Sequence, residues 1–190
     1  MPDTLRVTGP LTGRQAQIAA VARALLEAEG PAALTMRRVA DALGIKAPSL
    51  YKHVQDKTAL EALVVADGFT ELAGALEVAA ESGTENPEAH GTAGLAAMAR
   101  AYRAFGVTHP HLYRLMNYQP LRRDLLHAGL EERTTLPLLA ATGYHEARAR
   151  AMWAFAHGMV SLEIDGRFPP DADLDQAWRA GLAAFAGAAS

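Results

Sequence analysis

The sequence contains no cysteine, which excludes disulfide bonds and thiolate chemistry and fits a reducing compartment. It also has no uninterrupted apolar run of about 18 residues, so we expect no membrane-spanning helix and no membrane partner. Residues 1–13 contain proline, glycine and aspartate in place of the apolar core of a signal peptide. These absences together predict a cytoplasmic protein.

β-Branched runs and alternation of apolar with polar residues are almost absent, whereas apolar residues recur at helical spacing along the chain. With 190 residues, half of them hydrophobic, the chain is long enough for one large domain or two small ones. We therefore predict an all-α fold of about nine helices, with a three-helix N-terminal head joined to a larger helical body. The predicted boundary gives a head at residues 1–55 and a body at residues 56–190.

The body is predicted from its apolar periodicity and from its proline and glycine breaks. The clearest loop is SGTENPEAHG at residues 82–91, and Pro137 is expected to kink the helix that contains it. The expected helices span residues 56–80, 92–108, 111–117, 121–142, 144–168 and 171–189.

Charge is unevenly distributed along the chain, whose net charge is −3. Residues 1–57 hold eight Lys/Arg and five Asp/Glu, whereas the remaining residues hold ten and sixteen. A basic head on an acidic body indicates that only the head approaches an anion. Because the excess is small, chance is an equal alternative on this evidence alone.

The head has the signals of three short helices. Thr35 is a good N-cap for the second helix, which is expected to end at Leu43, and Gly44 suits a left-handed cap after it. Pro48 suits the first turn of the third helix, and Asp56 is expected to cap the helix after that. A tight glycine-containing turn between the second and third helices is the pattern of a helix-turn-helix.

The third helix buries a narrow stripe, Leu50 and Val54, and leaves its other side chains exposed. Lys52 can reach a guanine or a phosphate, and the other exposed groups also suit base edges and phosphate oxygens. An ordinary helical hairpin with a solvated polar face is the alternative. The predicted DNA-contacting residues are Thr35, Arg37, Lys46, Pro48, Ser49, Tyr51, Lys52, His53 and Lys57.

The segment LTMRRVADALGIKAPSLYKHVQDKTALEALV, residues 34–64, closely resembles the DNA-binding domain of the TetR family of bacterial repressors. The similar elements are the threonine that begins the second helix, ADALG-I before the turn, and P-S-L-Y-x-H-V in the third helix. The resemblance implies that Pro48, Ser49, Tyr51, Lys52 and His53 contact the groove and phosphates, with Arg37 and Lys57 in support. Position 52 varies in this family, so the resemblance does not give the operator sequence.

The segment MWAFAHGMVSLEIDGRF, residues 152–168, is similar to the W-x-x-x-H-G type of TetR C-terminal domain. This helix is apolar nearly all round and must be covered on every side, which one chain of this length can do only in part. Small residues in the last helix allow close helix contact. We therefore predict a twofold homodimer through helices at about 144–168 and 171–189, and the family implies the same four-helix interface. A monomer with a thick core is the alternative.

Aromatic and methionine side chains gather in the body and can line a largely apolar small-molecule pocket. The alternative for each is plain core packing, and for His157 it is a satisfied core histidine. The predicted pocket residues are Met98, Tyr102, Phe105, Tyr113, Met116, Trp153 and His157.

His109 and His111 flank a proline, but no third ligand stands at metal-binding spacing, so we predict no metal site and no cofactor. No catalytic constellation is visible, and we predict that the protein is not an enzyme. The sequence thus predicts a dimeric DNA-binding regulator, most simply a repressor that a small molecule releases from a palindromic operator. The alternatives are an all-α enzyme or carrier that uses the body pocket, and an activator or architectural protein without an inducer.

Overall fold

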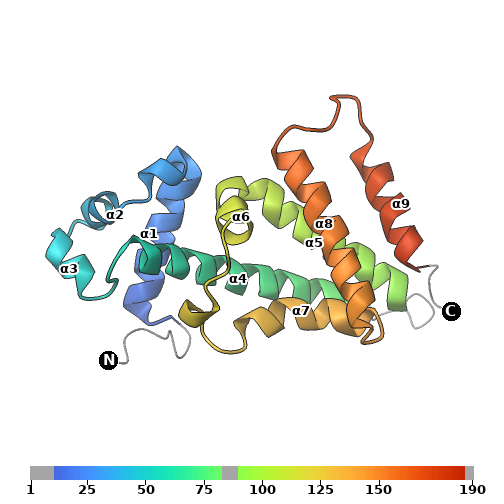
Figure 1. Ribbon diagram of the computed structural model, residues 1–190, viewed down its shortest axis with the longest axis horizontal. Coiled ribbons are helices and arrows are strands. Elements are labelled where there is room, and N and C mark those ends of the chain that lie inside the picture. Colours follow the sequence, from blue (N-terminus) through green and yellow to red (C-terminus); the bar gives the residue numbers. More distant parts are fainter. Residues whose placement is uncertain (1–10, 83–89, 187–190) are drawn as a thin grey trace. The chain divides into compact units, whose positions relative to one another are not determined.

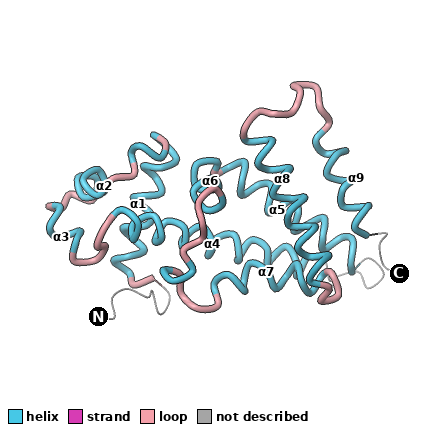
Figure 2. Tube along the Cα trace, viewed as in Figure 1, coloured by secondary structure: helices cyan, strands magenta, loops and turns pink. Residues whose placement is uncertain are grey.

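The computed structural model describes residues 11–82 and 90–186, and every regular element in these ranges is a helix (Figures 1 and 2). The prediction of an all-α fold is confirmed, and the described ranges contain nine α-helices. None of these helices is long and apolar enough to cross a membrane. In chain order the elements are α1 (Gly13–Glu29), η1 (Pro31–Ala33), α2 (Met36–Ala42), α3 (Ala47–Tyr51), α4 (Lys57–Ser82), α5 (His90–Thr108), α6 (Pro110–Asn117), η3 (Arg123–Leu125), α7 (Leu130–Ala141), α8 (Glu146–Ile164) and α9 (Leu174–Ala186).

The chain forms two compact units. Unit 1 comprises Met1–Glu71 and His109–Glu131, and unit 2 comprises Leu72–Thr108 and Glu132–Ser190. The chain passes between them within α4, after α5 and within α7. Unit 1 therefore contains α6 as well as α1, α2 and α3. The predicted boundary between residues 55 and 56 separates two functions, whereas the two units are defined by contacts within the chain. The functional boundary therefore stays a prediction.

Unit 1 has a core of side chains from α1, α2, α3, α4 and α6. Thr12 forms a capping box with Gln15 and begins α1, whose residues Ile18, Ala22 and Leu26 are fully buried. The core continues with these fully buried side chains: Val39, Leu50, Val54, Leu60 and Leu112.

The local signals predicted for the head are confirmed. Thr35 caps α2, with its Oγ1 atom accepting from the Arg38 N–H at 3.2 Å. Gly44 adopts φ +67°, a left-handed conformation that ends the turn at little steric cost. Asp56 accepts a hydrogen bond from the Ala59 N–H at 2.8 Å and so caps α4.

In unit 2, α5, α8 and α9 pack against one another. Met98, Tyr102 and Phe105 form the buried face of α5. From the partner helices, Met152 of α8 and Trp178 of α9 are also buried.

Some predicted helix boundaries are wrong. Residues 121–142 do not form one helix: the short η3 follows Pro120, and α7 begins only after Gly129, whose φ of +83° is incompatible with a continuing helix. Predicted loop residues Ser82, His90 and Gly91 are helical, and residues 83–89 of that loop lie outside the described ranges.

The predicted helices at 144–168 and 171–189 are shorter in the structure, as α8 and α9. Tyr144 at φ +62° stands before α8, and Gly166 at φ +61° follows it. Residues 187–189 lie outside the described ranges.

Candidate nucleic-acid interface

The helix-turn-helix is anchored by the buried side of α3. Leu50 of α3 is 0% exposed, and Val54, which follows this five-residue helix, is 1% exposed, so apolar side chains hold the helix at its centre and just after its end. The backbone N–H groups of His53 and Val54 both donate to the Leu50 carbonyl, at 2.9 and 3.0 Å. Packing of α3 against α2 completes the motif. The short helix is therefore fixed from behind, while its other side stays free of the core.

The opposite side of α3 exposes the side chains predicted to meet DNA. Tyr51 is 50% exposed although it is a large aromatic residue, and Pro48 and Ser49 are exposed beside it. Lys46 and Lys52 are exposed and form no ion pair with any described residue. This surface offers hydroxyl and ammonium groups whose hydrogen-bonding capacity is left for an outside acceptor. His53 is exposed at its flank.

Two more predicted contacts lie at the N-termini of α2 and α4. The Arg37 side chain is 90% exposed, and its Nε atom is 3.9 Å from the Asp41 carboxylate. Lys57 is exposed at the first residue of α4, 3.5 Å from Glu61. Exposed pairs of this kind are weak, so either cation can turn to a phosphate instead. Thr35, by contrast, is half-buried and uses its hydroxyl as the cap of α2.

The seven predicted pocket residues are divided between the two units. Tyr113 and Met116 are buried on α6 in unit 1, and Met98, Tyr102 and Phe105 are buried on α5 in unit 2. Burial of these five side chains is also what ordinary core packing requires. Their role as a pocket stays a prediction.

Trp153 and His157 of α8 behave differently from those five. Trp153 is 52% exposed and stacks on the His157 ring, with 6.0 Å between the ring centroids. Burial lowers the pKa of His157, because it penalises the charged imidazolium. Exposed apolar surface on α8 also includes Leu162.

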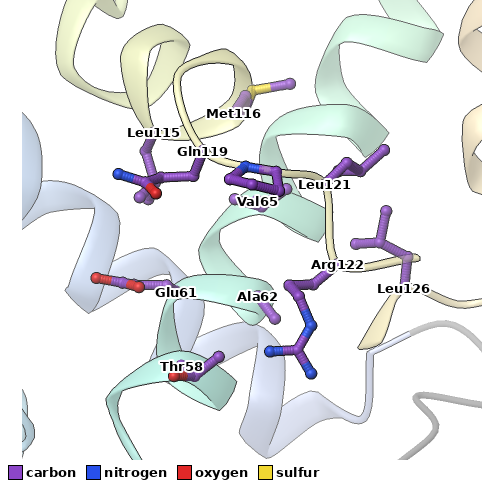
Figure 3. Close-up of a pocket in the computed structure, with 11 residues that line it drawn as sticks. Thr58, Glu61, Ala62, Val65, Leu115, Met116, Gln119, Leu121, Arg122 and Leu126 are labelled. Carbon is purple, nitrogen blue, oxygen red and sulfur yellow. The ribbon is translucent and has the colours of Figure 1, made fainter. Parts of the chain in front are cut away.

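A small cavity in unit 1 was not predicted from the sequence (Figure 3). It lies among the first turns of α4, the end of α6 and the segment that follows α6. Its volume is about 60 Å³, whereas sites that bury a drug-sized ligand hold roughly 300–1,000 Å³. The lining residues are Thr58, Glu61, Ala62, Val65, Leu115, Met116, Gln119, Pro120, Leu121, Arg122 and Leu126.

A part-buried polar cluster, also not predicted, links α1, α4 and the start of α6 in unit 1. Arg23 of α1 pairs with Asp67 at 3.0 Å and with Glu71 at 2.5 Å, both on α4. His109, which precedes α6, lies with its Nε2 atom 3.3 Å from Glu71. Burial opposes ionisation of Glu71, but the Arg23 hydrogen bond and charge prevail and lower its pKa.

Unit 2 pairs its own part-buried charge. Arg103 of α5 makes a bidentate contact with Glu163 of α8, at 2.8 and 2.9 Å, and reaches Asp175 of α9 at 2.5 Å. These contacts raise the pKa of Arg103, with the Glu163 hydrogen bond as the largest cause. The described residues hold no group of three or more His, Asp or Glu side chains arranged to bind a metal ion.

Two family models match the chain. The model described as "Bacterial regulatory proteins, tetR family" matches residues 18–63, and "Tetracyclin repressor-like, C-terminal domain" matches residues 95–185. The two matches together cover more than two thirds of the sequence. No curated protein sequence matches the chain.

Several solved structures have a similar fold. A protein of unknown function from Rhodococcus sp. RHA1 is 23% identical, with a TM-score of 0.72 over 95% of this chain and 97% of that one. ActR from Streptomyces coelicolor in complex with (S)-DNPA is 23% identical, with a TM-score of 0.64 over 93% and 96% of the chains. TetR from Acinetobacter baumannii AYE, as a variant in complex with minocycline, is 23% identical, with a TM-score of 0.62 over 93% and 94%. At these identities the likeness shows the fold alone.

Proposed function

Because this chain belongs to the TetR family of bacterial regulatory proteins, we propose that it is a ligand-responsive transcriptional repressor and not an enzyme. The observation that carries the proposal is the outward face of α3. Tyr51 and Lys52 stand exposed on a short helix whose only fully buried side chain is Leu50. A helix held in this way can enter the major groove of DNA without disturbing the core behind it.

The helix-turn-helix supports operator binding by a homodimer. The α3 helices of two copies would enter successive major grooves about 34–36 Å apart, so the operator would be palindromic. Tyr51, Lys52 and Ser49 would meet base edges or phosphates, and Arg37, Lys46 and Lys57 would hold the phosphate backbone. The exposed groups of these residues support the assignment, since most of them lack a strong partner among the residues that the structure describes.

The homodimer would form through α8 and α9. Trp153 and Leu162 of α8 are large apolar side chains that one chain leaves exposed. Gly181 of α9 lies so close to the Phe155 ring of α8 that a Cβ atom there would collide with it. This tight pairing makes α8 and α9 a firm platform on which a second copy can pack to form the predicted four-helix interface.

A small molecule would control release from the operator. ActR and the TetR variant named above were each solved with a small molecule bound. In this chain, the effector would bind in the body near the predicted pocket residues and would be largely apolar. It can release DNA only by binding more tightly to a conformer with a different spacing of the two α3 helices.

The decisive experiment is selection of bound duplexes from a random-sequence DNA library by the purified full-length protein. We expect a palindromic consensus, with two half-sites about one helical turn apart. A set of unrelated sequences, or no enrichment over a mock selection without protein, would contradict the proposal. A screen of small molecules for release of the selected duplex then tests the repressor mechanism separately from DNA binding.

A further inference from the structure

The N-terminus of α6 is capped by a residue from another helix. The N-cap position of α6 is His109, whose side chain makes no capping hydrogen bond. Instead, the Leu112 N–H in the first turn of α6 donates to the Glu27 Oε1 atom of α1 at 2.7 Å. A carboxylate at this place satisfies a backbone donor that the helix cannot, and its charge is favoured by the helix dipole.

The Glu27 contact is directional, whereas the packing around it is apolar. Glu27 is half-buried, and Leu112 is fully buried. Close packing sets the spacing of the two helices, and a charge-assisted hydrogen bond to a backbone N–H adds a contact that depends on direction. Glu27 therefore contributes a directional tie between α1 and the first turn of α6.

Further contacts join α1 and α6 to a third helix, α4. Arg23, one turn before Glu27 on α1, pairs with Asp67 and Glu71 of α4, and Glu71 also meets His109. The two helices α4 and α6 approach closely at Gly68, where a Cβ atom would come within 2.7 Å of the Met116 Sδ atom. Met116 also lines the small cavity of Figure 3.

We propose that Glu27 is a positioning residue for DNA recognition, which acts by fixing α6 against α1, the helix on which α2 of the helix-turn-helix packs. The chain of contacts runs from α6 to α1, from α1 to α2 and from α2 to α3, all within unit 1. Residues 109–131 thus lie in the same compact unit as the helix-turn-helix, although they fall within the 95–185 match to the C-terminal family model. This inference rests on the proposed function, because its readout is recognition of the operator.

Three substitutions separate the hydrogen bond from the charge. Glu27→Gln keeps the length of the side chain and a carbonyl that accepts from Leu112, whereas Glu27→Asp keeps the charge but is one methylene too short. Glu27→Ala removes both. Gln17→Ala is the control, because Gln17 is an exposed residue of the same helix and, among the described residues, its side chain bonds to Arg14 on the same helix alone.

The measurement compares affinity for the selected duplex with affinity for a scrambled duplex of equal length. For Glu27→Ala and Glu27→Asp we expect about tenfold weaker binding to the selected duplex, the size of one charged hydrogen bond, and scrambled-duplex affinity unchanged within about twofold. The affinity of Glu27→Gln for each duplex should stay within about threefold of the wild-type affinity. The affinities of Gln17→Ala should equal those of the wild type. Circular dichroism at the assay temperature checks that each variant is folded, and if Glu27→Ala unfolds, Glu27→Asp decides.

An equal loss on both duplexes, or no loss in the Asp and Ala variants, would overturn the inference. An equal loss is what a merely structural role gives, since it lowers the folded fraction without changing preference. If the wild type itself does not distinguish the two duplexes, the proposed function fails. If the wild type does distinguish them and the Glu27 variants behave like it, the inference about Glu27 alone fails.

Discussion

The helix-turn-helix of unit 1 and helix α8 of unit 2 leave different kinds of surface without a partner. At the two ends of α3, Lys46 and Lys52 are exposed and form no ion pair with any described residue. On α8, Glu163 is matched by Arg103 and Arg150 by Glu146, whereas the large apolar side chain of Trp153 is half exposed. An unmatched cation favours binding to an anion, and an exposed aromatic side chain favours contact with another apolar surface. The difference supports DNA as the partner of unit 1 and a second copy of the chain as the partner of unit 2.

The largest effect is expected where the unmatched polar groups of unit 1 are removed. Tyr51→Ala combined with Lys52→Ala should weaken binding to the selected duplex at least about a hundredfold, because each groove contact is worth roughly 1–3 kcal/mol. Fluorescence anisotropy with labelled duplex measures the loss. Thermal stability should hardly change, since both side chains are exposed.

A matched variant sharpens that experiment. Tyr118→Ala with Arg150→Ala removes a tyrosine of nearly equal exposure, 48% against 50%, and an exposed arginine of unit 2. We expect its affinity to equal that of the wild type. If both double variants lose affinity alike, α3 is not the contact surface.

The next largest effect is expected on the apolar surface of unit 2. Trp153→Ala should weaken the homodimer by about 2 kcal/mol or more, roughly thirtyfold in its dissociation constant, as truncation of a buried tryptophan hot spot does. Sedimentation equilibrium measures this constant. The control is Leu136→Ala on α7, since Leu136 is also 52% exposed but lies outside the predicted interface. Equal weakening by both variants, or a monomeric wild type, would contradict a homodimer interface through α8.

A smaller effect is expected from the matched charges within unit 2. Arg103→Met should lower the free energy of unfolding by about 1–2 kcal/mol, because Glu163, 18% exposed, loses its partner. We place the loss below that of a fully buried pair because solvent reaches Arg103, which is 27% exposed. Arg133→Met is the control: it breaks a bidentate pair of similar geometry with Glu77, but one that is well exposed, and urea unfolding should show no change. A larger loss of unfolding free energy in Arg133→Met than in Arg103→Met would contradict the claim that burial makes the Arg103 contacts more stabilising.

The smallest effect is a dependence of the free energy of unfolding on pH, and as the pH falls it should appear first through His157 of unit 2. Burial lowers the pKa of His157, so the unfolded chain, with an ordinary value of about 6.5, takes up the proton first. The stability from the neutral ring is fully present above about pH 6.5 and is lost as the pH falls through the lower pKa of the folded state. Urea unfolding between about pH 7.5 and 5 should show this decline, and His157→Gln should remove it.

Unit 1 should respond at lower pH. Arg23 lowers the pKa of Glu71 despite the opposing effect of burial, so the contribution of Glu71 is present above its ordinary value of 4.5 and is lost as the pH falls through the lower folded value. A decline above about pH 5 that persists in His157→Gln would show that another group is responsible.

Features with a local cause can be predicted from the sequence. Thr35, Gly44 and Asp56 were predicted correctly because a cap or a left-handed turn depends on one side chain and its immediate backbone. The prediction of one helix at 121–142 was wrong because apolar periodicity continues through Gly129, and the pattern does not show that this residue adopts a left-handed conformation.

Contacts between distant residues could not be predicted in the same way. Glu27 and Leu112 are 85 positions apart, and Arg23 and Asp67 are 44 apart. The sequence contains their chemistry, but nothing in it states which carboxylate meets which donor. The pocket prediction has the same weakness, because an aromatic residue at helical spacing looks alike whether it is buried, as Tyr113 is, or half exposed, as Trp153 is.

The most direct test of the account is the salt dependence of wild-type binding to the selected and scrambled duplexes. We predict that the logarithm of the affinity falls linearly with the logarithm of salt concentration, with a slope that reports several neutralised phosphates. We also predict a preference for the selected duplex of at least about a thousandfold at physiological salt. A slope near zero, or equal affinity for both duplexes at every salt concentration, would contradict the claim that unit 1 reads DNA.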